Sequence, residues 1–208
     1  MKLISDFRDY YDHWFDNSDP TFNRLMGATQ SQGPTKQEQF KLIAQAGYVT
    51  IPYGRPIDFS AEDLLVVYLD ETLHAGEGKS LMPQPKALEQ HPDKLCSLYI
   101  ASNSISTRYL WVGSRCFELT YENLDKREWR SNVGEVDVGF EKELFNHPHP
   151  KCLSQFPLVA IDFVGGYGID LNIAPGIKYT GLEDILSGRE VYELIKEYTN
   201  GRISNQIN

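Results

Sequence analysis

The most informative stretch of the sequence is Phe156-Pro-Leu-Val-Ala-Ile-Asp162-Phe-Val-Gly-Gly-Tyr-Gly-Ile-Asp170-Leu-Asn172-Ile-Ala-Pro-Gly-Ile177. It consists of two short apolar runs joined by a glycine-rich segment, a pattern that is typical of a β-hairpin. Each run carries an aspartate where a buried strand would favour Val or Ile. The sequence therefore predicts a hairpin whose strands hold acidic side chains in an apolar setting.

Whether the two acids meet depends on the turn, because successive side chains of a strand point to opposite faces. A two-residue turn through the first two glycines would place Asp162 and Asp170 on opposite faces of the hairpin. A three-residue turn would place Asp162, Asp170 and Asn172 on one face, and this is the arrangement that we expect. Two carboxylates and an amide oxygen that converge in this way suit Mg²⁺. The alternative is a surface hairpin with two solvated acids.

The same stretch resembles the metal-binding end of ATP-grasp enzymes, in which an acid ends one strand, acid-x-Asn ends the next and a Pro-Gly loop follows. It is most similar to the branch that includes glutathione synthetase and the glutamate ligases that act on ribosomal protein tails. The second acid of that branch is usually Glu, whereas this chain has Asp170. The resemblance implies that Asp162, Asp170 and Asn172 hold Mg²⁺ for a bound ATP.

The composition bounds the class of protein. A chain of 208 residues is long enough for one well-buried domain or two small lobes. The formal net charge of −9 argues against a nucleic-acid partner, whose phosphates need a basic face, but it permits ATP in a local cationic pocket. Three scattered cysteines do not form a disulfide framework, which favours the reducing cytoplasm. Without an apolar run of membrane-spanning length or a signal peptide, we expect a soluble protein with no membrane partner.

The pattern along the chain predicts an α+β, ATP-grasp-like fold with antiparallel sheets and flanking helices. We expect residues 1–33 to form an N-terminal helical extension, since apolar residues recur there at helical spacing. Its opening resembles that of short uncharacterised phage and bacterial proteins, which carries no function. Residues 34–102 form a small α+β lobe that begins with the capping box Thr35-Lys-Gln-Glu38. We expect residues 103–208 to form an antiparallel-sheet lobe that holds the acidic hairpin and a C-terminal helix, which is capped by Ser187-Gly-Arg-Glu190 and ends near Gly201.

A glycine loop, His74-Ala-Gly-Glu-Gly-Lys-Ser80, follows the predicted strand over residues 64–69. It is not a Walker A loop, because the first glycine of that motif is missing and prolines interrupt the helix that should follow. The loop resembles the phosphate-covering loop of ATP-grasp enzymes, which implies that Lys79 reaches a phosphate. The lysine that the family places near the end of the strand is replaced here by Tyr68 or Leu69. The alternative is a solvated surface turn.

A second hairpin is predicted over residues 107–121, with its turn at Gly113-Ser114. On a two-residue turn Arg108 shares its face with apolar residues, so its guanidinium requires an anionic partner. The arginine of ATP-grasp enzymes at this place contacts phosphate, and the alternative is a structural ion pair. Further along, Arg130-Ser-Asn132 resembles the loop of the glutamate-ligase branch that faces the phosphates and the acceptor. The resemblance implies catalytic roles for Arg108 and Arg130, and nucleotide contacts from these two, Lys79 and Asn132.

His147, His149 and Cys152 lie close together in the sequence, but they lack a fourth ligand and the paired spacing of a zinc site. We therefore do not expect zinc. The leading hypothesis, by resemblance, is a protein that binds ATP and Mg²⁺ and activates a carboxylate as an acyl phosphate for attack by an amine. Its substrate would be a small carboxylate and amine or a protein tail. The alternatives are a non-catalytic relative that binds nucleotide or protein, and a phage-borne structural or interaction protein.

Overall fold

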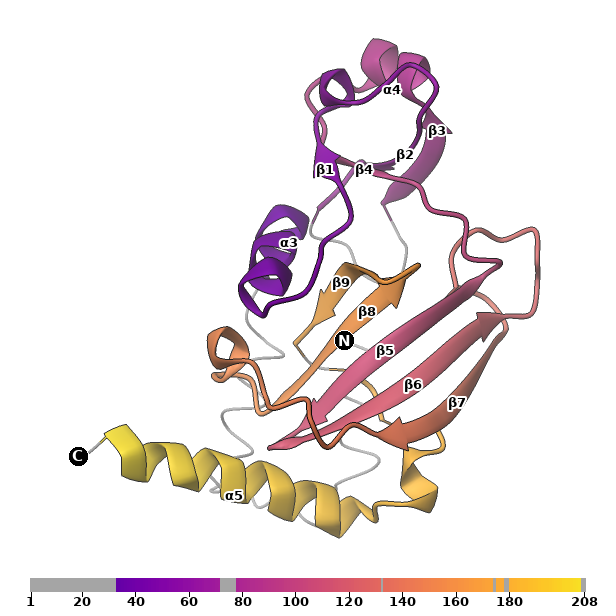
Figure 1. Cartoon of the computed structure of the whole chain (residues 1–208). Coiled ribbons are helices and arrows are strands. Elements are labelled where there is room, and N and C mark those ends of the chain that lie inside the picture. Colours follow the sequence, from indigo (N-terminus) through magenta and orange to yellow (C-terminus); the bar gives the residue numbers. More distant parts are fainter. Residues whose placement is uncertain (1–32, 72–77, 132, 174, 178–179, 207–208) are drawn as a thin grey trace.

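In the computed structural model of the chain, the described residues are 33–71, 78–131, 133–173, 175–177 and 180–206. The helical extension expected over residues 1–33 lies outside them, apart from Gly33. The described part contains two antiparallel sheets, one four-stranded and one five-stranded, together with flanking helices (Figure 1). This arrangement confirms the predicted α+β class.

The smaller sheet has the strand order β1-β4-β2-β3, and all of its pairs are antiparallel. Its inner strand β2 is buried on both faces, because Leu65 and Val67 pack in one apolar cluster while Val66 and Tyr68 pack in another. Burial on both faces explains why this strand is a continuous apolar run. The elements are β1 (Tyr53–Gly54), the short helix η1 (Pro56–Asp58), β2 (Leu64–Tyr68), β3 (Lys79–Pro83), α4 (Gln84–Gln90) and β4 (Cys96–Leu98).

The larger sheet has the strand order β7-β6-β5-β8-β9 and is also antiparallel. Helix α5 covers one of its faces, where Val191 and Ile195 pack against Leu110 and Phe117. The predicted turn at Gly113-Ser114 is confirmed, since Val112 pairs with Arg115. The elements are β5 (Ile105–Val112), β6 (Arg115–Asn123), β7 (Val136–Glu143), η2 (Lys151–Leu153), β8 (Leu158–Val164), β9 (Tyr167–Asn172), η3 (Leu182–Asp184) and α5 (Gly188–Gln206).

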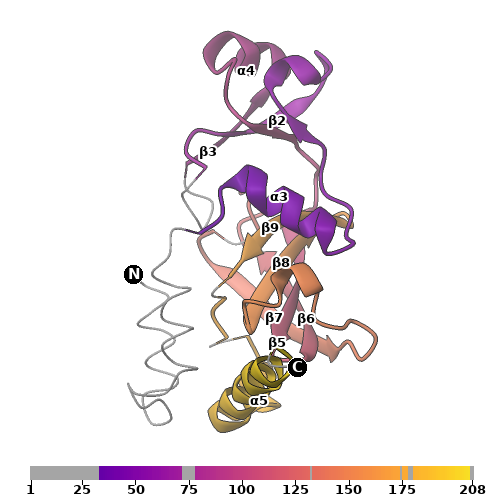
Figure 2. The same ribbon diagram turned by 90° about the vertical axis from the view of Figure 1, so that its left-hand side faces the viewer.

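Helix α3 (Lys36–Gln45) lies beside β9 and between the two sheets (Figure 2). It begins at the predicted capping box, in which Thr35 and Glu38 bond each other's backbone nitrogens. On one side Ile43 packs into the core of the larger sheet, and on the other Phe40 stacks on Tyr53, with ring centroids 4.6 Å apart. The helix therefore contributes to the apolar clusters of both sheets.

The hairpin β8–β9 places the two aspartates on one face, as predicted, but by a different route. Its turn has two residues, Gly165 and Gly166, whose positive φ values of 57° and 84° suit glycine. The expected three-residue turn is therefore wrong. Phe163 pairs with Gly168, and Asp162 pairs with Asp170, so β9 has one extra residue, Ile169, between these two pairs. This β-bulge shifts the alternation of side chains by one and brings Asp170 to the same face as Asp162.

Candidate functional site

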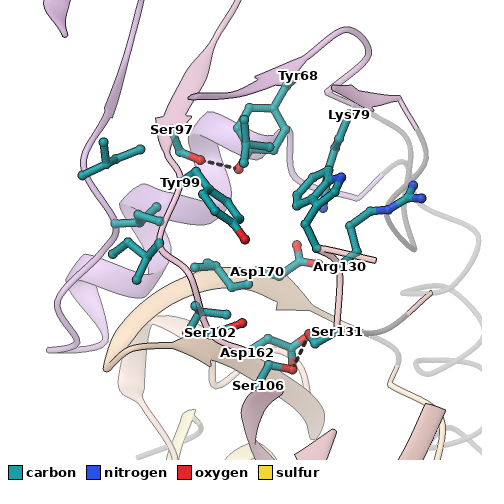
Figure 3. A pocket seen from close by; sticks show the side chains of 17 residues that line it. Tyr68, Lys79, Ser97, Tyr99, Ser102, Ser106, Arg130, Ser131, Asp162 and Asp170 are labelled. Carbon is teal, nitrogen blue, oxygen red and sulfur yellow. Dashed lines mark hydrogen bonds between the residues drawn. The ribbon is translucent and has the colours of Figure 1, made fainter. Parts of the chain in front are cut away.

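A pocket lies where the small sheet faces the acidic hairpin of the large sheet (Figure 3). Strands β2 and β3 contribute Tyr68 and Lys79, and the hairpin contributes Asp162 and Asp170. The loop from Trp129 to Ser131 supplies a further wall. Because residues from both sheets line it, the pocket exists only when the two sheets are brought together.

Three charged side chains stand in a row across the large sheet: Arg108 on β5 is opposite Asp162 on β8, which is opposite Asp170 on β9. Arg108 binds Asp162 with two parallel hydrogen bonds, from Nε to Oδ1 at 2.6 Å and from Nη2 to Oδ2 at 2.8 Å. Its Nη1 donates to the hydroxyl of Tyr121 at 2.8 Å. Arg108 is thus a partner of the acidic hairpin, and it supports the pocket from behind Asp162 without lining it.

Both members of this pair are buried, with 8% of Arg108 and 6% of Asp162 exposed. Burial alone would lower the pKa of Arg108, but the adjacent carboxylate of Asp162 outweighs burial and raises that pKa above its ordinary value. The guanidinium therefore stays charged. The ion pair that the sequence left as an alternative is present in the structure.

The partner of Asp170 is Lys36, a residue that the sequence analysis did not select. Lys36 is the first residue of α3, and only 3% of it is exposed. Its Nζ donates to Oδ1 of Asp170 at 2.5 Å, to the backbone oxygen of Ile169 at 3.0 Å and to Oε1 of Gln39 at 2.9 Å. An ammonium has three N–H donors, so these three acceptors match its full capacity.

The environment of Asp170 keeps it ionised. Burial would raise the pKa of its carboxyl, but the ammonium groups of Lys36 and Lys79 outweigh burial and hold the pKa well below its ordinary value. One weak signal in the sequence could have singled out Lys36. A cation in the first turn of a helix interacts unfavourably with the helix dipole, and a nearby anion would offset this.

Two further cations line the pocket. Lys79 is directly opposite Tyr68 in the small sheet, and its Nζ lies 5.8 Å from the centre of the Tyr68 ring. The guanidinium of Arg130 donates to both carboxylate oxygens of Glu128, at 2.7 Å each, and lies 5.5 Å from the centre of the Trp129 ring. Lys79 on β3 thus brings an ammonium group next to the end of β2, where the ATP-grasp family would place a lysine on β2 itself.

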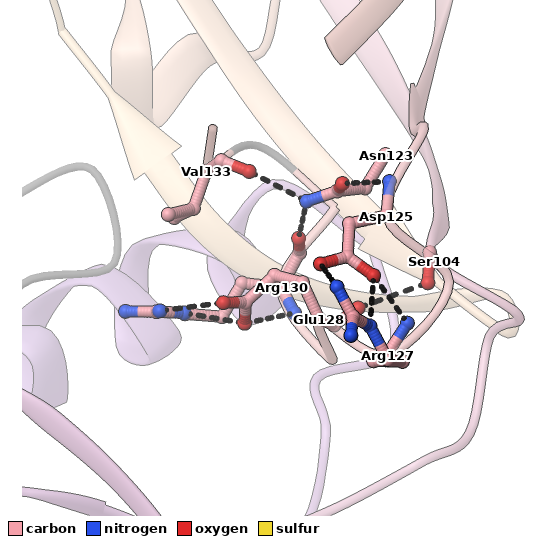
Figure 4. Close-up of polar contacts among 7 residues, drawn as sticks. All are labelled: Ser104, Asn123, Asp125, Arg127, Glu128, Arg130 and Val133. Atoms are coloured by element: carbon pink, nitrogen blue, oxygen red, sulfur yellow. Dashed lines mark hydrogen bonds and ion pairs between the residues drawn. The ribbon is translucent and has the colours of Figure 1, made fainter. Parts of the chain in front are cut away.

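The loop that carries Arg130 is held by side chains from the large sheet (Figure 4). The side-chain nitrogen of Asn123 donates to the backbone oxygens of Arg130, at 2.8 Å, and Val133, at 2.5 Å. Asn123 is only 1% exposed, so these bonds are protected from water. At the pocket, Ser131 donates to Ser106 on β5 at 2.7 Å. The loop is therefore anchored at the backbone of Arg130 and at the residues that directly follow it.

The structure brings together four of the residues selected from the sequence, since Lys79, Arg130, Asp162 and Asp170 all line the pocket. Arg108 touches the pocket only through Asp162. Asn172 is opposite Ala160, two residues from Asp170 on the same strand, and does not line the pocket. Asn132 lies outside the described residues.

The acidic residues do not fit a magnesium site in this arrangement. Arg108 occupies both carboxylate oxygens of Asp162, and Lys36 occupies one oxygen of Asp170. Within the part of the chain that the structure describes, no group of three or more His, Cys, Asp or Glu side chains is placed to hold a metal ion. A divalent ion bridging the two acids would have to compete with Arg108 for Asp162 and would stand beside the ammonium of Lys36 at Asp170.

Comparison with known proteins identifies the fold. No family model matches the sequence, and no curated protein is similar to it in sequence. The structure is similar to that of the ATP-grasp ligase PsnB complexed with a phosphomimetic variant of its minimal precursor, Mg and ADP: the TM-score is 0.53, the identity 14%, and the match covers 83% of this chain and 60% of that one. PsnB complexed with minimal precursor gives a TM-score of 0.53 and 15% identity, over 78% of this chain and 60% of that one.

The chain therefore has an ATP-grasp-like fold, which confirms the resemblance seen in the sequence. It spans 60% of the length of the PsnB chains. At such low identity the likeness concerns the fold, and function has to be argued from the site. Among the described residues, no helix combines the length and the apolar character that crossing a membrane requires.

Proposed function

We propose that the chain binds ATP in the pocket between its two sheets. The observation that carries the proposal is the presence of Lys79 and Arg130 on the walls of one pocket, which also has apolar and aromatic walls that include Tyr99 and Trp129. Charged nitrogen donors bind phosphate oxygens strongly, and aromatic and apolar walls suit a nucleotide base. The ATP-grasp-like fold supports this assignment.

Nucleotide binding, without ligation, is the function that the geometry supports best. The PsnB ligase was complexed with Mg and ADP, whereas in this chain Arg108 and Lys36 hold the two acids that would carry a metal. This favours the non-catalytic, nucleotide-binding alternative. ATP-dependent ligation of a small carboxylate or a protein tail to an amine is a separate hypothesis, and release of ADP in the presence of an amine acceptor tests it.

Calorimetric titration with ATP tests the proposal. We expect saturable binding to the wild type and a loss of about tenfold or more in affinity for Lys79→Gln, because a hydrogen bond to a charged group contributes about 1.5–3 kcal/mol. Lys86→Gln is the matched control, since Lys86 is exposed on α4 beside the same sheet and does not line the pocket. Absence of heat with ATP, or equal losses in the two variants, would contradict the proposal.

A further inference from the structure

The charge around the pocket is balanced by residues of the chain itself. Four side chains that line it are charged, namely Lys79, Arg130, Asp162 and Asp170, and three more pair with these: Lys36, Arg108 and Glu128. Positive charges exceed negative ones by one in this set, although the whole chain has a formal net charge of −9. The charges around the pocket thus nearly cancel, whereas the protein as a whole is acidic.

A polyphosphate is repelled by a pair of carboxylates unless a cation stands between them, and the common solution is a divalent ion. Here the carboxylate of Asp162 is bound by a guanidinium and that of Asp170 by an ammonium. Neither cation is supplied from solution. Arg108 comes from the strand next to Asp162, and Lys36 comes from a helix that packs on β9.

We infer that Lys36 and Arg108 act as built-in counter-ions of Asp170 and Asp162, so that the pocket accepts the phosphates of a nucleotide without a divalent cation. This rests on nucleotide binding in the pocket, as proposed above. Lys79 and Arg130 are the cations that line the pocket and can contact the phosphates directly. Lys36 and Arg108 are positioning residues, because they act through the acids.

Both counter-ions are fixed by the fold. The Nζ atom of Lys36 has an acceptor for each of its three protons, and its stem is anchored by the capped first turn of α3. The aromatic rings of Phe40 and Tyr68 lie around it, with centres 5.5 and 5.6 Å from Nζ. Arg108 makes two bonds to Asp162 and one to Tyr121. A metal that replaced either cation would leave a buried charge without its partner.

The first experiment compares ATP binding to the wild type in Mg²⁺ and in a chelating buffer by calorimetry. We expect the two dissociation constants to agree within about threefold. A dissociation constant about tenfold or more lower with Mg²⁺ would overturn the inference. Titration of the wild type with Mn²⁺ alone, followed by electron paramagnetic resonance, should show no bound ion. A stoichiometric Mn²⁺ site abolished by Asp170→Asn would also overturn it.

The second experiment removes one counter-ion. In Lys36→Met the carboxylate of Asp170 faces the pocket without its cation, so ATP affinity should fall about tenfold in chelator and recover when Mg²⁺ is added. Lys36→Arg keeps the charge and should keep metal-independent binding. Lys41→Met, an exposed position on the same helix, is the matched control. Unchanged ATP affinity of folded Lys36→Met in chelator would contradict the inference.

The outcomes separate the inference from the proposed function. If ATP binds in neither buffer, the proposed function fails, and metal-independent nucleotide binding fails with it. The Mn²⁺ titration still decides on its own whether Asp170 is closed to divalent ions. If Lys36→Met does not fold, the two wild-type measurements are sufficient, because each has an outcome that overturns the inference.

Discussion

The Nζ atom of Lys36 lies 2.5 Å from Oδ1 of Asp170, although the two residues are 134 positions apart in the chain. This contact joins the start of α3 to the last strand of the large sheet. It also places a cation on one of the two acids that would otherwise attract a metal ion. A single ion pair therefore links the packing of a helix to the chemistry of the pocket.

Breaking this pair should destabilise the protein. The side chain of Lys36 is 4% exposed and that of Asp170 is 20% exposed, so each charge would lose a partner in a largely dry place. We expect Lys36→Met and Asp170→Asn each to lower the free energy of unfolding by about 3 kcal/mol. The double variant should lose less than the sum of the two. Chemical denaturation of the four proteins measures these differences.

The control is Lys126→Met, which removes the cation of the pair between Lys126 and Glu122. Their side chains are 54% and 43% exposed, and exposed pairs contribute little. We expect a change within about 0.5 kcal/mol. Additive effects of Lys36→Met and Asp170→Asn would show that the two side chains do not interact.

The same pair should make stability depend on pH in the acid range. The pKa of Asp170 is held below its ordinary value of 3.8 in the folded state, so the pair stabilises the protein fully above that ordinary value. The contribution is lost as pH falls through the lower, folded pKa. In that window wild-type stability should fall by up to about 1.4 kcal/mol per pH unit more than that of Asp170→Asn. Denaturation curves at successive acid pH values test this, and parallel curves would contradict it.

Arg108→Lys should be damaging although it keeps the charge. A lysine cannot reproduce the two parallel bonds to Asp162 and the third bond to Tyr121. We expect a loss of about 2 kcal/mol in the free energy of unfolding. Arg115→Lys is the matched control, because Arg115 also binds Glu143 through two bonds, but its side chain is 33% exposed. Equal losses at the two sites would mean that burial of the Asp162 pair has no effect.

Arg130→Gln should weaken ATP binding without unfolding the protein. Arg130 lines the pocket, whereas Arg127 in the same loop has a side chain that is 90% exposed and does not line it. We expect about tenfold lower affinity for Arg130→Gln and unchanged affinity for Arg127→Gln. Calorimetry measures the affinities, and thermal melting verifies that both variants fold. An unchanged affinity of Arg130→Gln would remove this residue from the site.

Features that depend on near neighbours in the chain could be predicted from the sequence. The capping box at Thr35 and Glu38 and the turn at Gly113-Ser114 form as predicted, because their partners lie three residues apart or fewer. The length of that turn also predicted correctly that Arg108 lies on the same face of the hairpin as apolar residues such as Leu110 and Leu119. The motifs around the acidic hairpin also indicated an ATP-grasp-like fold, which the structural comparison confirms.

Helix α5 shows the limit of such local signals. The sequence predicts its start at Ser187, and the side chain of Ser187 does cap it, through a bond from the backbone nitrogen of Glu190. Its end was expected near Gly201, yet the helix continues to Gln206. That expectation was wrong because one glycine costs a helix only about 1 kcal/mol and does not by itself end it.

How the two aspartates meet, and which cations they bind, depends on contacts between distant parts of the chain. The bulge beside Gly168 forms where the segment around Thr50 bonds to β9: the nitrogen of Gly168 donates to Val49, and that of Ile51 donates to Gly168. A side chain at Gly168 would also strike Ile43 of α3. These partners lie more than 100 positions away, so no local pattern contains them.

The choice of ion-pair partners is tertiary for the same physical reason. A guanidinium on an apolar face requires an anion, and this much follows from the sequence. The chain has 29 acidic residues, and no local sequence pattern predicts which of them pairs with Arg108 or which cation pairs with Asp170. Charges pair according to distance in space, and the packing of α3 on β9 sets that distance for Lys36. The two aspartates could be identified from the sequence. Their ion pairs with Lys36 and Arg108 form only when the chain folds and brings the helix and the strands together.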